Sequence, residues 1–522
     1  MNKQNANNDR TSGKGIGKIN SRTYTPISDA LAQPQVFADT ELADGIKRHS
    51  LVNIFTKSFG KPRRTDGEPL ASILSALLVW PLLKVRSIHC FCFELCQFLS
   101  GRKEDSRRRQ DILYTVLGRE DINWRNQSRN LALSVVKQND FGRMEERAFV
   151  VDDSIKQRRG RRVEGSSSHW DHTEGRTISG QQVLEFGLAS ASGYMPLDRQ
   201  IFMSSKNAVE KPEDNDFRDK RSAAARDMAR ARDESKHIMF RRMLRTAIKG
   251  GLKAKYALGD AWFGSKENIE AAEACGVSAI FQMKRGKLQY WIESGEEPEG
   301  RLFTAKQLYE KHRRRMKKAS KEARYKTCRI EAWVNLETKA NKEARWQKVI
   351  LVLSTSAGSE SGENWVIFLT TDLKASAEQV LKIYALRWSI EVYFKEVKQH
   401  FGFLAEQSSR YQFSYASVHL AAIRYTLLFE AMHRGGRLTF GEVRDGQSGR
   451  LQLLSYAGLM WQLFRGLIDG ALDGLVSTIG QDTVESVLTA IDEAVDSFLN
   501  RALQIEPAMV EAQLHAESVG EL

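Results

Sequence analysis

Residues 383–403 read IYALRWSIEVYFKEVKQHFGF, and this stretch determines how the rest of the chain is interpreted. Four polar side chains recur in it at offsets of 0, 3, 7 and 14, namely Tyr384, Arg387, Glu391 and Lys398. At about 100° per residue of an α-helix, they fall within roughly 60° of one another. An adjoining stripe of apolar residues predicts a side packed on the core: Ile383, Leu386, Ile390, Phe394 and Val397. One helix face is therefore expected to carry a phenol, a guanidinium, a carboxylate and an ammonium.

This face has two interpretations. A carboxylate between two cations and a phenol is typical of a site that binds phosphate and metal together. The alternative is a solvent-exposed face on which residues four apart form ordinary ion pairs. Spacing alone does not separate the two, so the rest of the chain has to decide between them.

The spacing Tyr384-x2-Arg387-x3-Glu391-x6-Lys398 resembles the YREK signature of the insertion-sequence-four family of bacterial transposases. Members of that family are cut-and-paste enzymes with an RNase H-like catalytic domain and an Asp-Asp-Glu triad. The resemblance implies a DNA transposase that cleaves transposon ends and joins them to a target. The motif itself covers only about 15 residues.

Composition agrees with a nucleic-acid partner. The chain has 522 residues, 41% of them apolar, which is enough for two to four domains with a large core. Its 79 basic and 65 acidic residues give a formal net charge of +14. Such an excess is typical of proteins that bind a polyanion, most simply DNA, although an anionic membrane surface is an alternative.

The resemblance implies a bacterial protein associated with the nucleoid, and the sequence itself predicts a cytoplasmic protein without a membrane segment. The N-terminus is polar and does not resemble a secretory signal. The longest apolar run, around residues 77–83, contains Pro81 and is too short to span a bilayer. An odd number of cysteines, five, indicates a reducing compartment.

The N-terminal part divides into two segments. Residues 1–30 are rich in Asn, Gly, Ser, Lys and Arg, which predicts a disordered basic tail. Residues 31–145 carry apolar residues at helical spacing, which predicts a helical DNA-binding domain. No helix-turn-helix signature is visible there, so its mode of binding stays open.

Residues 146–285 read as the first part of an RNase H-like core. The predicted order is three strands, a helix, a strand, a helix and a strand. The first strand, AFVVDDS, ends in Asp152 and Asp153, and the fourth ends at Asp260. In the RNase H-like fold that this order resembles, the first and fourth strands are neighbours and carry two aspartates. Carboxylates at strand ends can converge on a metal, whereas mid-strand carboxylates would be buried at a cost of several kcal/mol.

The remaining chain is expected to complete this architecture. Residues 286–370 read as a mostly β insertion, and residues 371–404 as the core helix that carries Glu391. Residues 405–522 read as a C-terminal helical region. The predicted fold class is therefore α/β: an RNase H-like core interrupted by a β-rich insertion and flanked by helical regions at both ends.

The predicted catalytic and metal-binding residues are Asp152, Asp260 and Glu391. Two divalent cations about 3.5–4 Å apart can stabilise the attacking and leaving oxygens of a phosphodiester. Mg²⁺ takes oxygen ligands, so three carboxylates suffice, and Mn²⁺ can substitute.

Both aspartate assignments have alternatives. Asp152 and Asp153 point to opposite faces of a strand. The family places its catalytic Asp two residues before a Thr or Ser, and Ser154 favours Asp152 over Asp153. Asp260 is followed by Ala-Trp-Phe, which departs from the usual family context. Its alternative role is to cap the next helix.

Several residues are expected to contact DNA. Tyr384, Arg387 and Lys398 would hold phosphates that flank the scissile bond. Trp262 is a candidate for stacking on a flipped base, as are Trp333 and Trp346. Basic segments at 156–162 and 311–329 would follow the DNA backbone. The arginines concerned are Arg158, Arg159, Arg161, Arg162, Arg313, Arg314 and Arg315.

The expected partner is double-stranded DNA, both transposon terminal inverted repeats and target DNA. The resemblance also implies a homodimer on DNA, with the C-terminal helices as the contact. Two rival functions remain: an RNase H-like nuclease that cuts without joining, and a transposase-derived DNA-binding protein without catalysis.

Overall fold

The computed structural model describes most of the chain between residues 45 and 503. The described residues are 45–58, 70–83, 85, 87–94, 106–159, 162–171, 175–204, 217–292, 300–321, 323–337, 345–357, 364–435, 464, 466–468, 470–472, 474 and 476–503. The predicted tail at 1–30 lies outside them, as do residues 436–463 of the predicted C-terminal helical region. Among these described residues, no helix is long and apolar enough to cross a membrane.

Five strands form the part of the sheet that carries the predicted aspartates. They are β1 (Ala148–Gln157), β3 (Arg176–Ser190), β4 (Gly193–Phe202), β5 (Tyr256–Gly259) and β6 (Ser278–Met283). β3 is antiparallel to both β4 and β1, whereas β1, β5 and β6 run parallel to one another. These strands confirm the predicted order. A further strand, β2 (Ser167–Asp171), pairs with β3 and was missed because SSHWD lacks an apolar alternation.

Two helices lie between β4 and β5 in the sequence, and a third lies between β5 and β6. They are α8 (Ala223–Asp233), α9 (Lys236–Lys249) and α10 (Lys266–Ala274). Each begins after a serine whose side chain accepts a backbone N–H of the first turn, namely Ser222, Ser235 and Ser265. The predicted helices near α9 and α10 are therefore confirmed.

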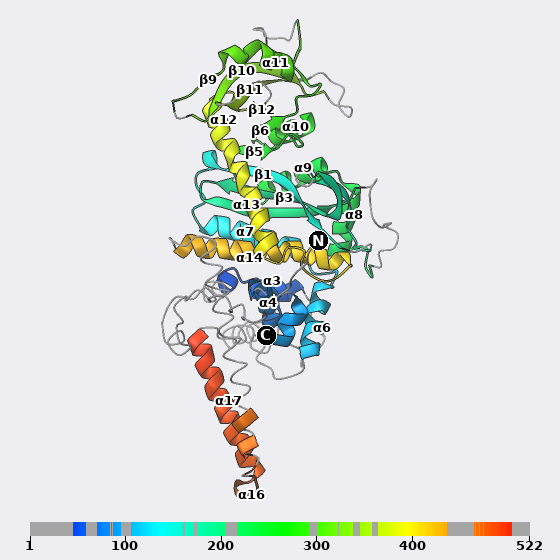
Figure 1. The fold of residues 1–522 in the computed structure, drawn as a ribbon, viewed down its shortest axis with the longest axis vertical. Coiled ribbons are helices and arrows are strands. Elements are labelled where there is room, and N and C mark those ends of the chain that lie inside the picture. Colours follow the sequence, from blue (N-terminus) through cyan, green and yellow to red (C-terminus); the bar gives the residue numbers. More distant parts are fainter. Residues whose placement is uncertain are drawn as a thin grey trace, which may run out of the picture.

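The sheet continues through the segment predicted as an insertion. Its strands are β7 (Gln289–Trp291), β8 (Phe303–Thr304), β9 (Lys317–Lys318), β10 (Tyr325–Asn335), β11 (Trp346–Ser356) and β12 (Trp365–Thr370), with helix α11 (Ala305–His312) after β8. β12 pairs antiparallel with β6, so one sheet runs β2-β3-β1-β5-β6-β12-β11-β10-β7-β8. Figure 1 shows this extension above the aspartate-bearing strands.

The motif-bearing stretch forms two helices in line rather than one. α12 (Ala377–Tyr384) leads into a 3₁₀ turn, η6 (Ala385–Arg387), and then into α13 (Trp388–His400). The prediction of one uninterrupted α-helix from residue 383 was therefore wrong at this turn. A 3₁₀ turn has three residues per turn and eclipses residues three apart, so it places Tyr384 in line with Arg387.

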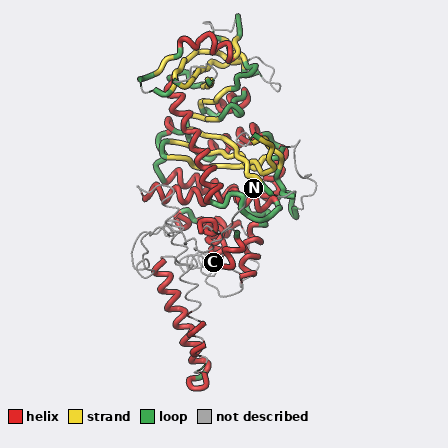
Figure 2. The backbone as a smooth tube through the Cα atoms, in the orientation of Figure 1, coloured by secondary structure: helices red, strands yellow, loops and turns green. Residues whose placement is uncertain are grey.

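Helices from the N-terminal and C-terminal parts of the sequence lie beneath the sheet. The N-terminal ones are α3 (Leu51–Ser58), α4 (Leu70–Val79), α5 (Ile88–Glu94), α6 (Ser106–Leu117) and α7 (Trp124–Gln138). α7 contacts β4 and the long helix α14 (Tyr411–Gly435). α7 and α14 lie beneath the strands in Figure 1, and Figure 2 shows the same arrangement. Almost all of α14 from Tyr411 to Glu430 is buried. α14 therefore belongs to the core and cannot provide the predicted dimer contact.

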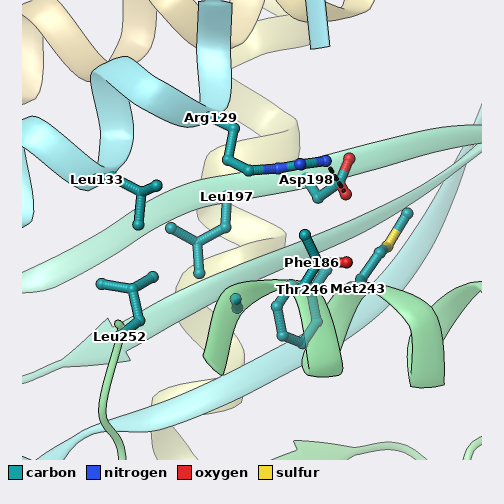
Figure 3. A pocket seen from close by; sticks show the side chains of 9 residues that line it. Arg129, Leu133, Phe186, Leu197, Asp198, Met243, Thr246 and Leu252 are labelled. Carbon is teal, nitrogen blue, oxygen red and sulfur yellow. Dashed lines mark hydrogen bonds and ion pairs between the residues drawn. The ribbon is translucent and has the colours of Figure 1, made fainter. Parts of the chain in front are cut away.

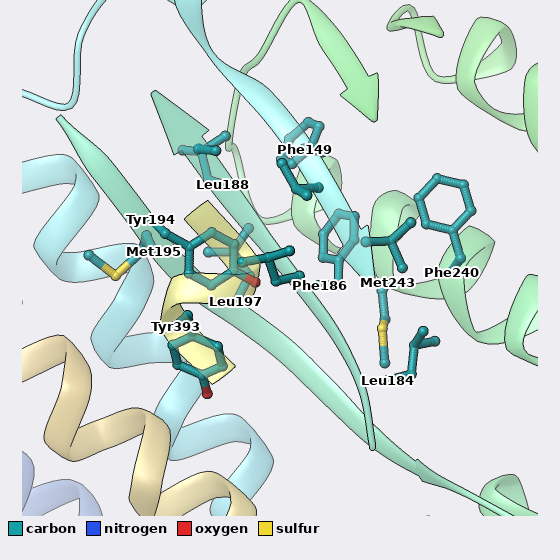
Figure 4. Close-up of a cluster of buried hydrophobic side chains, with 14 of the residues drawn as sticks. Phe149, Leu184, Phe186, Leu188, Tyr194, Met195, Leu197, Phe240, Met243 and Tyr393 are labelled. Atoms are coloured by element: carbon teal, nitrogen blue, oxygen red, sulfur yellow. The ribbon is translucent and has the colours of Figure 1, made fainter. Parts of the chain in front are cut away.

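One apolar cluster joins these layers. Figure 4 shows side chains of β1, β3, β4, α9 and α13 packed together. Phe149 stacks on Phe186 at 5.6 Å between ring centroids, and Tyr194 contacts Tyr393 at 5.2 Å. Tyr393 comes from α13, so the helix that carries Glu391 is anchored on the sheet by its buried face. The last described helices, α16 (Val476–Ile479) and α17 (Gln481–Leu503), extend away from this body in Figure 1.

Candidate active site

Asp152 and Asp260 lie level with each other on neighbouring strands. β1 and β5 are parallel, with Val150 opposite Leu258, and each aspartate follows two residues later. The apolar residues before them are fully buried, and burial decreases where the aspartates begin. Both carboxylates therefore lie just beyond the paired part of β1 and β5, where side chains of parallel strands can converge. β1 itself continues to Gln157, so the prediction that Asp152 ends its strand was wrong, because β3 pairs with β1 along its whole length.

Asp152 and Asp153 face in opposite directions. Asp153 pairs with Lys236 Nζ of α9 at 2.7 Å and accepts a hydrogen bond from Gln182 Nε2 at 2.5 Å. Asp152 faces η6 instead, where it pairs with Arg387. Burial raises the pKa of Asp152 to about 7, with the nearby Asp260 adding to the rise and Arg387 opposing it. Asp152 is thus the aspartate that shares a side with Asp260 and Arg387.

Arg387 links two of the predicted catalytic carboxylates. Its Nη1 donates to Asp152 Oδ2 at 2.5 Å, and its Nη2 donates to Glu391 Oε1. The three side chains retain 18%, 20% and 34% of their exposure for Arg387, Asp152 and Glu391, so the bridge is only partly shielded from solvent. Sequence reasoning assigned Arg387 to phosphate and missed this contact, because spacing on a helix says nothing about which strand lies opposite.

The other two signature residues also fasten the helix to the sheet. Tyr384 donates to Gln282 Oε1 of β6 at 3.4 Å, and burial raises its pKa to about 12, which keeps the phenol a donor. Lys398 Nζ donates to Ser154 Oγ at 2.6 Å and to Ile155 O at 2.8 Å, both on β1. The helix is thus held at both ends.

Asp260 shapes the turn after its strand. Its Oδ1 accepts the backbone N–H groups of Trp262 and Phe263 at 2.9 and 3.3 Å. The following helix α10 takes its cap from Ser265, so Asp260 does not fill the alternative capping role. The turn presents Trp262 to solvent with half of its surface exposed.

Two lysines flank the exposed indole. The ammonium groups of Lys236 and Lys284 lie 4.7 and 4.6 Å from the ring centroid of Trp262, and the His237 ring lies nearly parallel to it. Sequence reasoning proposed Trp262 but missed both lysines, which come from α9 and from the end of β6. A single lysine carries no recognisable signal in a chain this basic.

Residues 97–347 match the model of a family described as DDE superfamily endonuclease. The chain is similar to that family over these residues. The similarity supports a DDE-type transposase or endonuclease acting on DNA, a class that typically uses divalent metal ions. None of the curated proteins matched the chain.

The matched region contains Asp152 and Asp260 and ends before Glu391. Only geometry therefore connects Glu391 with the two aspartates. That connection is the Arg387 bridge between α13 and β1. Within the described part of the chain, no group of three or more His, Cys, Asp or Glu side chains is already arranged around a common metal position.

The remaining predicted contact residues lie in different settings. Arg158 donates to the carbonyl oxygens of residues 404, 406 and 408, so it fastens a loop rather than facing solvent. Trp333 is half-buried against Trp291, and Trp346 is half-buried as well. Arg161 lies outside the described residues. The exposed arginines among those predicted are Arg159, Arg162, Arg313, Arg314 and Arg315.

A small pocket lies elsewhere, between α7, β4 and α9 (Figure 3). Its wall is mostly apolar, with one ion pair between Arg129 Nη2 and Asp198 Oδ2 at 2.8 Å. Its volume of about 10 Å³ leaves room for about one water molecule. The pocket is therefore too small for a substrate.

Proposed function

We propose that this protein is a DNA transposase that cuts and joins the ends of an insertion sequence. Asp152, Asp260 and Glu391 are its catalytic carboxylates in this proposal. The observation that carries it is the parallel pairing of β1 and β5, which sets the two aspartates level, together with the Arg387 bridge to α13. The similarity to DDE superfamily endonucleases supports the same chemistry.

The fold assignment forms part of the proposal. Residues 146–285 and 371–404 would form an RNase H-like core, and residues 286–370 an insertion within it. The strand order β4-β3-β1-β5-β6, antiparallel in the first part and parallel in the second, supports this. Residues 31–145 would contribute a DNA-binding region and 405–522 a C-terminal helical region.

The carboxylates suit hard divalent cations. Asp152, Asp260 and Glu391 offer only oxygen donors, the ligand type that Mg²⁺ and Mn²⁺ prefer. That the cluster already attracts the cationic Arg387 indicates that it needs a counter-charge. Two Mg²⁺ ions bound there would stabilise charge on the attacking and leaving oxygens of a phosphodiester.

The surroundings of the cluster suit a DNA strand. Trp262 offers an aromatic surface beside Lys236 and Lys284, which combines stacking with phosphate attraction. The exposed arginines at 159, 162 and 313–315 would follow the backbone farther away. The substrates would be terminal inverted repeats and target DNA of the bacterial nucleoid. A homodimer on DNA would use α16 and α17, since α14 is buried.

The proposal is tested by incubating the protein with a labelled duplex taken from the DNA that flanks its own gene, in Mg²⁺. The wild type is expected to nick or cut at the transposon end and to join that end to a target plasmid. Glu391→Gln and Asp260→Asn should bind the duplex normally but cut at least about 100-fold more slowly, because losing a metal ligand removes several kcal/mol of transition-state stabilisation.

Other results of the same assay would favour one of the two alternative functions. Cutting without joined products would favour a nuclease that lacks strand transfer. Binding without cutting, by wild type and variants alike, would contradict the enzyme proposal and favour a DNA-binding protein.

A further inference from the structure

The guanidinium of Arg387 occupies the space between Asp152 and Glu391. It donates one N–H to Asp152 Oδ2 and another to Glu391 Oε1, so it contacts both residues with separate nitrogens. The other oxygen of Asp152, Oδ1, accepts the backbone N–H of Asp153 at 2.8 Å. Both oxygens of Asp152 therefore already have donors. A cation bridging Asp152 Oδ2 and Glu391 Oε1 would need the space that the guanidinium occupies.

Contacts on both sides of Arg387 fix η6 and α13 to the sheet, so the backbone that carries Arg387 cannot easily shift to admit a cation. Tyr384 ties it to β6 on one side of Arg387, and Lys398 ties it to β1 on the other. Tyr393 is fully buried beneath it. Movement that frees the carboxylates therefore has to come from the Arg387 side chain, which is long and flexible.

We propose that Arg387 is an internal counter-ion that holds the metal site closed until metal and DNA arrive together. This inference rests on the proposed function. In the protein alone, Arg387 neutralises Asp152 and Glu391 and competes with a divalent cation for them. When a DNA phosphate is present, the guanidinium exchanges the carboxylates for phosphate oxygens, which suit its paired N–H groups. Arg387 is thus a positioning residue that couples metal binding to DNA binding.

Coupling of this kind has a defined sign. Because the guanidinium has to leave before the cation binds, its removal should strengthen metal binding by the protein alone. If Arg387 instead merely held the two carboxylates in place for the metal, its removal should weaken metal binding. Metal affinity without DNA therefore separates the two roles, and it does not depend on catalysis.

The test is a Mn²⁺ titration of the full-length protein without DNA, in which free Mn²⁺ is followed by electron paramagnetic resonance. The variant is Arg387→Met, which keeps the length of the side chain and removes its charge. We expect it to bind Mn²⁺ about tenfold more tightly than the wild type, within the usual range of coupling between sites. Arg387→Lys should bind like the wild type. The matched control is Arg434→Met on α14. Like Arg387, Arg434 pairs with a glutamate four residues away in the sequence, here Glu430, and its loss should leave Mn²⁺ affinity unchanged.

Melting temperatures of all variants, measured without metal, check that each one folds. Asp260→Asn shows whether the measured Mn²⁺ occupies this site. Equal or weaker binding by folded Arg387→Met, with binding abolished by Asp260→Asn, would overturn the role of Arg387 and leave the proposed function intact. No Mn²⁺ binding by wild type or Arg387→Met would overturn the metal site and both proposals together.

Discussion

At the scale of single residues, two adjacent aspartates of β1 pair with cations on opposite sides of the strand. Asp152 forms an ion pair with Arg387 of η6, whereas Asp153 forms one with Lys236 of α9. Alternation along a strand predicted that the two would diverge. The strand pattern alone could not say which side holds the other carboxylates, because that depends on which helix covers each face. Only the family resemblance, through Ser154, favoured Asp152.

Exchanging each aspartate for asparagine tests this assignment. We predict that Asp152→Asn slows DNA cleavage at least about 100-fold, because a proposed metal ligand is lost. Asp153→Asn should retain most of the activity and lose mainly its ion pair with Lys236. Rates on the labelled duplex, at matched DNA binding, provide the measurement. A larger loss in Asp153→Asn than in Asp152→Asn would reverse the assignment.

At the scale of elements, the strands and helices of the sheet region were predictable. Apolar runs and alternation indicate the strands, and capping serines stand where the helices begin. Three features were not. β2 is polar, the 3₁₀ turn at 385–387 has no sequence signal, and Arg158 finds its partners in a loop about 250 residues away. In each case a tertiary contact, rather than local sequence, determines the conformation.

The bulge between β3 and β4 gives a prediction at this scale. A Cβ added to Gly187 would lie 2.3 Å from the Tyr194 ring and 2.5 Å from the carbonyl oxygen of Met195. Gly187→Ala should therefore destabilise the fold by about 1–3 kcal/mol and lower the melting temperature. Gly286→Ala is the control, because no atom lies within 4 Å of its added Cβ. Equal melting temperatures of the two variants would contradict this packing.

At the scale of the whole molecule, a buried carboxylate holds the N-terminal and C-terminal helical parts together. Glu430 of α14 contacts His49 Nε2 at 2.8 Å and Arg48 Nη1 at 3.0 Å, and it also accepts a hydrogen bond from Asn139. Burial alone would raise the pKa of Glu430, but these partners lower it to about 2.

This depressed pKa predicts acid sensitivity. A carboxylate whose pKa is lower in the folded than in the unfolded protein stabilises the fold above the unfolded value, near 4.3, and loses that effect as pH falls toward 2. Glu430→Gln should therefore lower the melting temperature at pH 7 and have a shrinking effect between pH 5 and pH 2. A melting-temperature difference that stays constant over this range would contradict the linkage.

The excess of positive charge also acts at this scale. Replacing Arg313, Arg314 and Arg315 by serine should weaken binding to all duplexes alike. The slope of log affinity against log salt should fall by about 0.9 for each phosphate contact that is lost. Binding titrations at several salt concentrations measure it, with Arg143→Ser, which removes an exposed arginine outside these basic segments, as the control. An unchanged slope of log affinity against log salt would show that the DNA does not contact Arg313, Arg314 and Arg315.

We propose that Asp152, Asp260 and Glu391, from three separate segments, surround one metal site. Fe²⁺ used in place of Mg²⁺ generates hydroxyl radicals that cut the polypeptide near bound metal. With peroxide and ascorbate, and with a DNA duplex present, we expect fragments that end close to residues 152, 260 and 391. Excess Mg²⁺ should suppress all three cuts. Cuts near 152 and 260 without one near 391, or no cuts suppressed by Mg²⁺, would show that the three carboxylates do not share a metal site.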